Sequence, residues 1–194
     1  HREETSWPAS QGFVPAVQFV WFLTVVKVRV VAHPENGLHC HVASLTMTTI
    51  RTFMTDDHRH CDDLFAEAEQ ALGKKNMPAA KAAFAHFCGA MLAHFDCEEK
   101  TLFPAFENKT GMRMGPTQVM RMEHSQMRAL LDEARVTLEQ GNIDDYLGLA
   151  DTLLIMMQQH NMKEENILYP MCDQHLVAEA PELLAHLESE LTEA

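Results

Sequence analysis

Residues 94–104 of the chain read HFDCEEKTLFP, and residues 160–170 read HNMKEENILYP. Both segments carry His, Glu, Glu, Leu and Pro at the same offsets, and an aromatic residue precedes each proline. The same 66-residue shift, from position 94 to position 160, moves His58 onto His124. The sequence therefore contains two related halves, each with a single histidine followed by an H-x-x-x-E-E motif.

The segments around these motifs have the pattern of amphipathic helices, with apolar residues three or four positions apart. We expect helices from Thr55 or Asp56 to near Gly73, from Pro78 toward Pro104, from Pro116 to Gly141, from Asn142 to just before Pro170, and a short one after Pro181. Residues 107–115, with two glycines, are expected to form a loop. Short connections make successive helices antiparallel neighbours. The sequence thus predicts an all-α, up-down-up-down four-helix bundle with a short extra C-terminal helix.

The first 46 residues differ in composition from the rest. They contain none of the 13 methionines, and their charges cancel, so the formal net charge of -13 arises from residue 47 onward. We interpret residues 1–46 as a non-native or disordered extension and residues 47–194 as the bundle domain, with Met47 as the natural start. A signal segment or membrane anchor at residues 13–26 is the alternative, but this run is short for a span and Lys27 and Arg29 follow it.

Charge and cysteine content narrow the range of partners. The negative charge argues against nucleic acid and anionic membranes, because their phosphates would be repelled. A small neutral or cationic ligand fits better. The five cysteines form no C-x-x-C pair, so we expect reduced thiols and a cytoplasmic protein. A homodimer is compatible with the sequence, which does not determine the oligomeric state.

The spacing within the motifs predicts a metal site. Helix residues four apart are separated by about 400°, only about 40° from the same direction. His94 and Glu98 can therefore reach a common point inside the bundle, and so can His160 and Glu164. Four imidazoles and two carboxylates in a core are hard to explain as packing, because an unpaired buried carboxylate costs on the order of several kcal/mol. Metal ions would supply the missing positive charge. Nitrogen and oxygen ligands without thiolate suit iron or manganese better than copper, with zinc an alternative.

Residues beside the motifs receive less direct roles. Glu99 and Glu165 are rotated by about 100° from the motif glutamates and are expected to face solvent or a neighbouring helix. His86 is a candidate to support or complete the ligand set. The remaining expectations are solvated histidines at His60, His175 and His186, a buried inert thiol at Cys97, and closure of the helix ends by Phe103 and Tyr169.

With these residues the chain resembles the hemerythrin-like (HHE cation-binding) family over roughly residues 47–174. The resemblance rests on DHR at residues 57–59, on MEH at residues 122–124 and on the two H-x-x-x-E-E segments. It implies a four-helix bundle with a non-haem di-iron centre. The implied ligands are four terminal histidines and two bridging glutamates: His58, His94, His124, His160, Glu98 and Glu164.

The chain differs at one position from the oxygen-carrying hemerythrins that it resembles. Those proteins have a second histidine four residues after the histidine on the third helix, and this chain does not. They also end the fourth-helix motif with Asp at a longer spacing, whereas this chain has Glu164. Arg128 occupies the place of the missing imidazole, where it could cover the pocket entrance or pair with a bridging carboxylate. One metal position is then open, filled by water or served by a ligand that the sequence does not identify.

The open position predicts a di-iron protein that binds or reacts with a small oxidant such as O2, H2O2 or NO. With turnover, it would be a peroxide- or NO-reactive oxidoreductase involved in oxidative stress. The alternatives are an iron storage or sensing module and repair of damaged iron centres. Repair is disfavoured because no additional cysteine-bearing N-terminal domain is recognisable. A structural protein without metal is the remaining alternative.

Overall fold

A computed structural model describes residues 48–192, so the interpretation of residues 1–46 and of the apolar run at residues 13–26 lies outside the described part of the chain. Within residues 48–192 the structure is helical, with no strand. In chain order the elements are α1 (Ile50–Gly73), α2 (Met77–Cys97), the π-helical segment η1 (Glu98–Leu102), α3 (Phe103–Thr110), α4 (Pro116–Gln140), α5 (Ile143–Lys163), the π-helical segment η2 (Glu164–Leu168), α6 (Tyr169–His175) and α7 (Ala180–Thr192).

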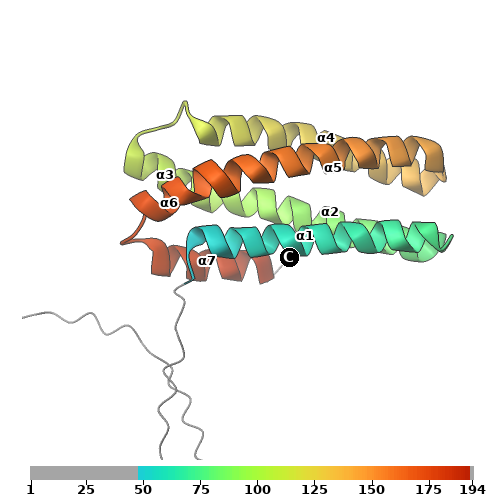
Figure 1. Cartoon of the computed structure of the whole chain (residues 1–194), viewed down its shortest axis with the longest axis horizontal. Coiled ribbons are helices and arrows are strands. Elements are labelled where there is room, and N and C mark those ends of the chain that lie inside the picture. Colours follow the sequence, from blue (N-terminus) through green and yellow to red (C-terminus); the bar gives the residue numbers. More distant parts are fainter. Residues whose placement is uncertain (1–47, 193–194) are drawn as a thin grey trace, which may run out of the picture. The chain divides into compact units, whose positions relative to one another are not determined.

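Four long helices make up the bundle. The segments α2, η1 and α3 follow one another without a break and form one of them, and α5, η2 and α6 form another. Together with α1 and α4 they lie side by side (Figure 1). Connections at residues 74–76, 111–115 and 141–142 are short, which makes successive helices antiparallel. The predicted four-helix bundle is confirmed, and α7 is the predicted extra C-terminal helix.

The start of α1 differs from the prediction, because the helix begins at Ile50 rather than near Thr55 or Asp56. Thr49 is the capping residue. Its hydroxyl accepts a hydrogen bond from the backbone N–H of Thr52, and the Thr52 hydroxyl accepts one from the backbone N–H of Thr49. This reciprocal cap normally uses Glu or Gln at the second position. Two threonines perform the same function here, so the usual sequence pattern was absent.

Two further boundaries also differ from the prediction. The helix expected to stop before Pro170 continues through that residue as α6, and α3 likewise continues through Pro104 to Thr110. Each proline is the second residue of an α-helical segment that follows a π-helical one, a place where its missing N–H costs little. The loop predicted at residues 107–115 is therefore limited to residues 111–115. The predicted end of α4 at Gly141 is correct, and Gly141 adopts the left-handed conformation typical of a C-cap (φ 78°).

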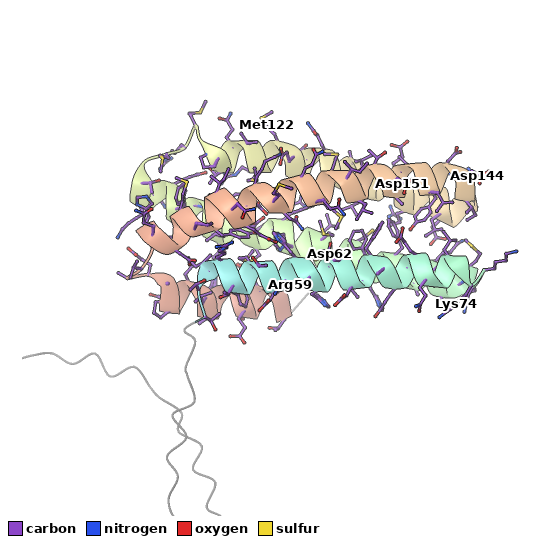
Figure 2. All side chains as sticks on the ribbon, viewed as in Figure 1. Arg59, Asp62, Lys74, Met122, Asp144 and Asp151 are labelled. Carbon is purple, nitrogen blue, oxygen red and sulfur yellow. The ribbon has the colours of Figure 1, made fainter. Side chains whose placement is uncertain are left out.

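The bundle interior consists of two apolar clusters separated by a polar layer. The turn-side cluster, which includes Phe65, Phe87 and Leu131, lies toward the α1–α2 and α4–α5 turns. The cap-side cluster includes Met54 and, from α7, Leu187. The buried histidines and glutamates of the repeat lie between these clusters along the helices. Side chains project into the space between the long helices as well as outward from them (Figure 2). No helix in the described part of the chain is long and apolar enough to cross a membrane.

Candidate metal centre

The four predicted histidines meet in the polar layer, although each comes from a different long helix. His58 of α1 and His94 of α2 face each other with their Nε2 atoms 3.2 Å apart. His124 of α4 and His160 of α5 do the same at 3.1 Å. All four side chains are buried. The labels of Arg59 and Asp62 in Figure 2 mark the stretch of α1 at the level of this layer.

The two motif glutamates connect the histidine pairs. Glu98 Oε2 lies 3.4 Å from Nε2 of His94 and 3.3 Å from Nε2 of His124, so it faces one histidine of each pair. Glu164 Oε2 lies 3.2 Å from the Nε2 atoms of the other two histidines. Both glutamates are fully buried. Each carboxylate is thus placed where a bridging ligand would have to be.

A second carboxylate orients each imidazole from behind. The four hydrogen bonds run from an Nδ1–H to a carboxylate oxygen and join His94 to Asp57 (2.7 Å), His160 to Glu123 (2.9 Å), His124 to Glu99 (2.8 Å) and His58 to Glu165 (2.9 Å). An ionised carboxylate can only accept, so Nδ1 carries the proton. Nε2 is therefore the nitrogen that faces the centre, where it can bind a proton or a metal ion.

The contacts of these four carboxylates with the histidines were not predicted from the sequence. Glu99 and Glu165 do contact a neighbouring helix, which was one of the two expectations, but the contact is with a predicted ligand. Asp57 and Glu123 each directly precede a histidine of the repeat and bind the histidine of the following helix. Their recurrence in both halves of the repeat was the signal that could have identified them.

Both π-helical segments begin at a motif glutamate, η1 at Glu98 and η2 at Glu164. In a π-helix the backbone hydrogen bond joins residues five apart, so residues five apart share a face. Tyr169 is five residues after Glu164, and its hydroxyl donates to Glu164 Oε2 at 3.0 Å. In a regular α-helix these two residues would diverge by about 140°. The π-turn therefore brings a tyrosine into the centre that α-helical spacing would have directed elsewhere.

The position of the Tyr169 hydroxyl corrects the expectation that this residue only closes a helix end. The hydroxyl also lies 2.8 Å from Glu98 Oε1 and 3.1 Å from His58 Nε2. Burial, together with the charges of Glu164 and Glu98, raises the pKa of Tyr169 well above its usual value. The hydroxyl therefore remains protonated and shares its hydrogen between the two carboxylates. Phe103, the counterpart in the first half of the repeat, has no hydroxyl to offer.

The electrostatics of the layer favour added positive charge. Burial alone would lower the pKa of His94, but the carboxylates of Glu98 and Asp57 outweigh it and raise this pKa to about 9. Burial would raise the pKa of Glu164, but the imidazoles, His160 foremost, hold it well below its usual value. The imidazoles and carboxylates thus attract a cation, whether a proton or a metal ion.

The geometry and the unsatisfied oxygens fit a metal centre. Glu98 Oε2 and Glu164 Oε1 are buried and make no hydrogen bond. Two groups of ligand atoms lie close enough to hold an ion, one from Glu98, His124, His160 and Glu164, the other from His58, His94 and Glu164. Atoms bound to one ion at about 2.1 Å and at right angles are about 3 Å apart. The observed imidazole and carboxylate separations are of that size.

The remaining candidates lie outside the layer. His60 is exposed as predicted, and His86 is also exposed, which does not support a role for it in the ligand set. Cys97 is buried, and burial raises the pKa of its thiol above the usual value, in agreement with an inert cysteine. Arg128 pairs with Asp96 at 2.7 Å and lies over the Phe95 ring at 5.3 Å. It does not contact a bridging carboxylate.

Comparison with known families agrees with the site. The family described as hemerythrin HHE cation binding domain matches residues 49–172, well over half of the chain. The matched range runs through α1 to α6 almost in full and contains all six predicted ligands. Searches of curated proteins and of solved structures gave no match. The chain belongs to the hemerythrin HHE cation-binding domain family.

Proposed function

We propose that the polar layer holds two iron ions and that the protein binds or reacts with a small oxidant, O2, H2O2 or NO. The observation that carries this proposal is the position of Glu98 and Glu164. Each buried carboxylate faces imidazoles of both histidine pairs, and each has one oxygen without a hydrogen bond. Two carboxylates shared between two sets of imidazoles suit a pair of ions about 3.5–4 Å apart.

The choice of iron follows from the types of ligand. Imidazole and carboxylate without thiolate suit iron or manganese, and zinc is usually bound singly by four ligands in a structural site. The nearby thiol of Cys97 is buried, and its raised pKa disfavours the thiolate that a softer metal would select. Bound iron would supply the change between ferrous and ferric states and a Lewis-acidic position for the oxidant.

Residues around the centre support this chemistry in three ways. The orienting carboxylates fix the imidazoles and strengthen their electron donation. The Tyr169 hydroxyl holds a proton within hydrogen-bonding distance of both bridging carboxylates. The apolar clusters on both sides, represented by Phe95 and Leu102, exclude bulk water from the layer. A buried, dry centre with a proton donor favours a small ligand over a large substrate.

The two histidine pairs differ in the proton donor beside them. The bridging carboxylates face both pairs at 3.2–3.4 Å, so they do not distinguish the two sides. The Tyr169 hydroxyl lies on the His58 side, 3.1 Å from His58 Nε2. The oxidant would therefore bind on the His58 side, next to the tyrosine hydroxyl.

Anaerobic loading with ferrous iron, followed by O2, H2O2 or NO in separate experiments, tests the proposal. A ferric pair bridged by oxygen absorbs in the near ultraviolet, so a new band with peroxide or O2, or a distinct one with NO, is the expected result. The Glu98→Gln/Glu164→Gln double variant, which removes both bridging charges, is the control and should show neither band. Iron-loaded protein that is inert to all three oxidants would contradict the proposal.

Iron sensing is a second candidate, and one feature favours it. The six ligands come from all four long helices, so bound metal would tie the bundle together. Binding energy of this kind contributes directly to folding and depends on pH, because protons compete for the imidazoles. A large rise in melting temperature with iron, without consumption of any oxidant, would support sensing or storage instead of oxidant chemistry.

A further inference from the structure

The two histidine pairs differ in the charges behind them. We refer to His58 and His94 as the α1–α2 pair and to His124 and His160 as the α4–α5 pair. Each imidazole has an orienting carboxylate at 2.7–2.9 Å, so the hydrogen bonds themselves are equivalent. The two pairs differ in whether Lys or Arg side chains neutralise those carboxylates.

Both carboxylates of the α4–α5 pair have a cationic partner. Lys163 forms an ion pair and a hydrogen bond with Glu123, which orients His160. Arg128 lies 3.7 Å from Glu99, which orients His124. Three of these four side chains are less than a third exposed, and Lys163 is 42% exposed. Partly buried ion pairs are screened by salt less than surface pairs.

The carboxylates of the α1–α2 pair lack such partners. Among residues 48–192, neither Asp57 nor Glu165 forms an ion pair with Lys or Arg. The repeat shows how the difference arose, because the shift of 66 residues places Cys97 where Lys163 would be and Asp62 where Arg128 would be. The counterpart of Arg128 is thus an acid rather than a base, so this position supplies no compensating positive charge.

A cation on an orienting carboxylate reduces the negative charge that this carboxylate shares with the imidazole. The imidazole then donates less electron density to a metal, and the cation itself repels the metal through space. On the α1–α2 side, a carboxylate without a cationic partner keeps its full negative charge, so its imidazole donates more electron density to a metal. Glu98 and Glu164 each face one imidazole of either pair at 3.2–3.4 Å, so the bridging carboxylates do not distinguish the two sides. The two cations do.

We propose that Arg128 and Lys163 are positioning residues that make the two metal positions inequivalent. They weaken metal binding at the α4–α5 pair and leave the α1–α2 pair as the stronger electron donor. The inference rests on the dinuclear centre proposed above. It adds that the two metal positions differ in affinity. The α1–α2 position, where the oxidant would bind, would hold an oxidised metal more tightly.

Titration of the metal-free full chain with Co2+ tests this inference without reference to activity. Calorimetry and the visible absorption of bound Co2+ together resolve two binding steps. Lys163→Gln is the primary variant, because Arg128 also packs on the Phe95 ring. In Lys163→Gln and in Arg128→Gln, one step should tighten by about tenfold, and the other should change by less than about twofold. Asp62→Asn should instead weaken the step that those variants leave unchanged.

Two control variants separate a local effect from a change in net charge. Lys163→Arg keeps the charge and should bind Co2+ like the wild type. Lys109→Gln also removes one positive charge, but Lys109 pairs with Glu179 rather than with an orienting carboxylate, so both steps should stay unchanged. Equal shifts of both steps in Lys163→Gln, no shift at all, or the same shift in Lys109→Gln would overturn the inference. Failure of the wild-type chain to bind any Co2+ would overturn the metal centre itself.

Discussion

The turn-side cluster and the polar layer occupy adjacent levels of the same four helices but are held together differently. In the cluster, Phe65, Phe84 and Phe87 lie with their ring centroids 5.0 and 5.6 Å apart and are stabilised by burial alone. In the layer, buried carboxylates and imidazoles are stable only if the charges balance. The cluster therefore stabilises the fold without a ligand. The layer instead needs compensating positive charge, which protons or metal ions can supply.

Phe87→Ala should have the largest effect and should act on the cluster alone. Phe87 is fully buried, and truncation of a buried Phe costs about 3–5 kcal/mol because a cavity remains. We expect a loss of this size in the free energy of unfolding, measured with urea. The loss should be the same with and without iron. A loss that disappears on metal binding would show that the two levels are not independent.

Metal loading should stabilise the layer and leave the cluster unaffected. A metal that binds only the folded state adds about 2.7 kcal/mol at a free concentration a hundred times its Kd. Unfolding with and without anaerobic Fe2+ measures this increment. It should be retained in Phe87→Ala and lost in Glu164→Gln, which removes a bridging charge. Retention of the full increment in Glu164→Gln would contradict the assignment of that residue.

Tyr169→Phe should have a smaller effect, because it removes only a hydroxyl and keeps the ring. The variant has the same residue as Phe103, the counterpart of Tyr169 in the first half of the repeat. Loss of the shared hydrogen bond to Glu98 and Glu164 should cost about 1–2 kcal/mol in unfolding free energy. Iron stoichiometry should not change, but the near-ultraviolet response to peroxide should. An unchanged spectrum and an unchanged reaction rate would assign Tyr169 to packing only.

The smallest effect is expected at Glu107, outside both levels. Burial would raise the pKa of Glu107, but hydrogen bonds from Thr117 and Arg121 outweigh it and lower this pKa below its ordinary 4.5. Since the folded-state pKa is the lower one, the carboxylate stabilises the fold above about pH 4.5 and loses this contribution as the pH falls through the folded-state value. Glu107→Gln should cost at most about 1 kcal/mol at pH 7 and flatten the acid side of the stability profile. An unchanged profile would exclude this contribution.

Most of the architecture could be predicted from the sequence because helical periodicity and glycine or proline positions act locally. The ends of α1 at Gly73 and of α4 at Gly141 are examples. The six predicted ligands do meet, because i and i+4 on one helix share a face and the repeat supplies two such helices. Their role as metal ligands remains a proposal, and so do iron, the oxidant and the cytoplasmic location.

What could not be predicted depends on changes of helical geometry and on contacts between helices. The π-turns at Glu98 and Glu164 have no local sequence rule that we could apply, and they determine where Tyr169 points. The pairing of Glu165 with His58 joins residues 107 positions apart, which helical periodicity cannot relate. The role of Arg128 was left open for the same reason, because its partner Asp96 belongs to another helix.

The buried imidazoles and carboxylates of the layer are expected to meet around two cations. Metal analysis of the chain after anaerobic loading with Fe2+ and removal of unbound iron is the direct test, with the Glu98→Gln/Glu164→Gln double variant measured in parallel. We expect about two irons per wild-type chain and a much lower content in the double variant. A wild-type chain that retains no iron, or a double variant that retains as much as the wild type, would show that the layer is not a dinuclear centre built on these two glutamates.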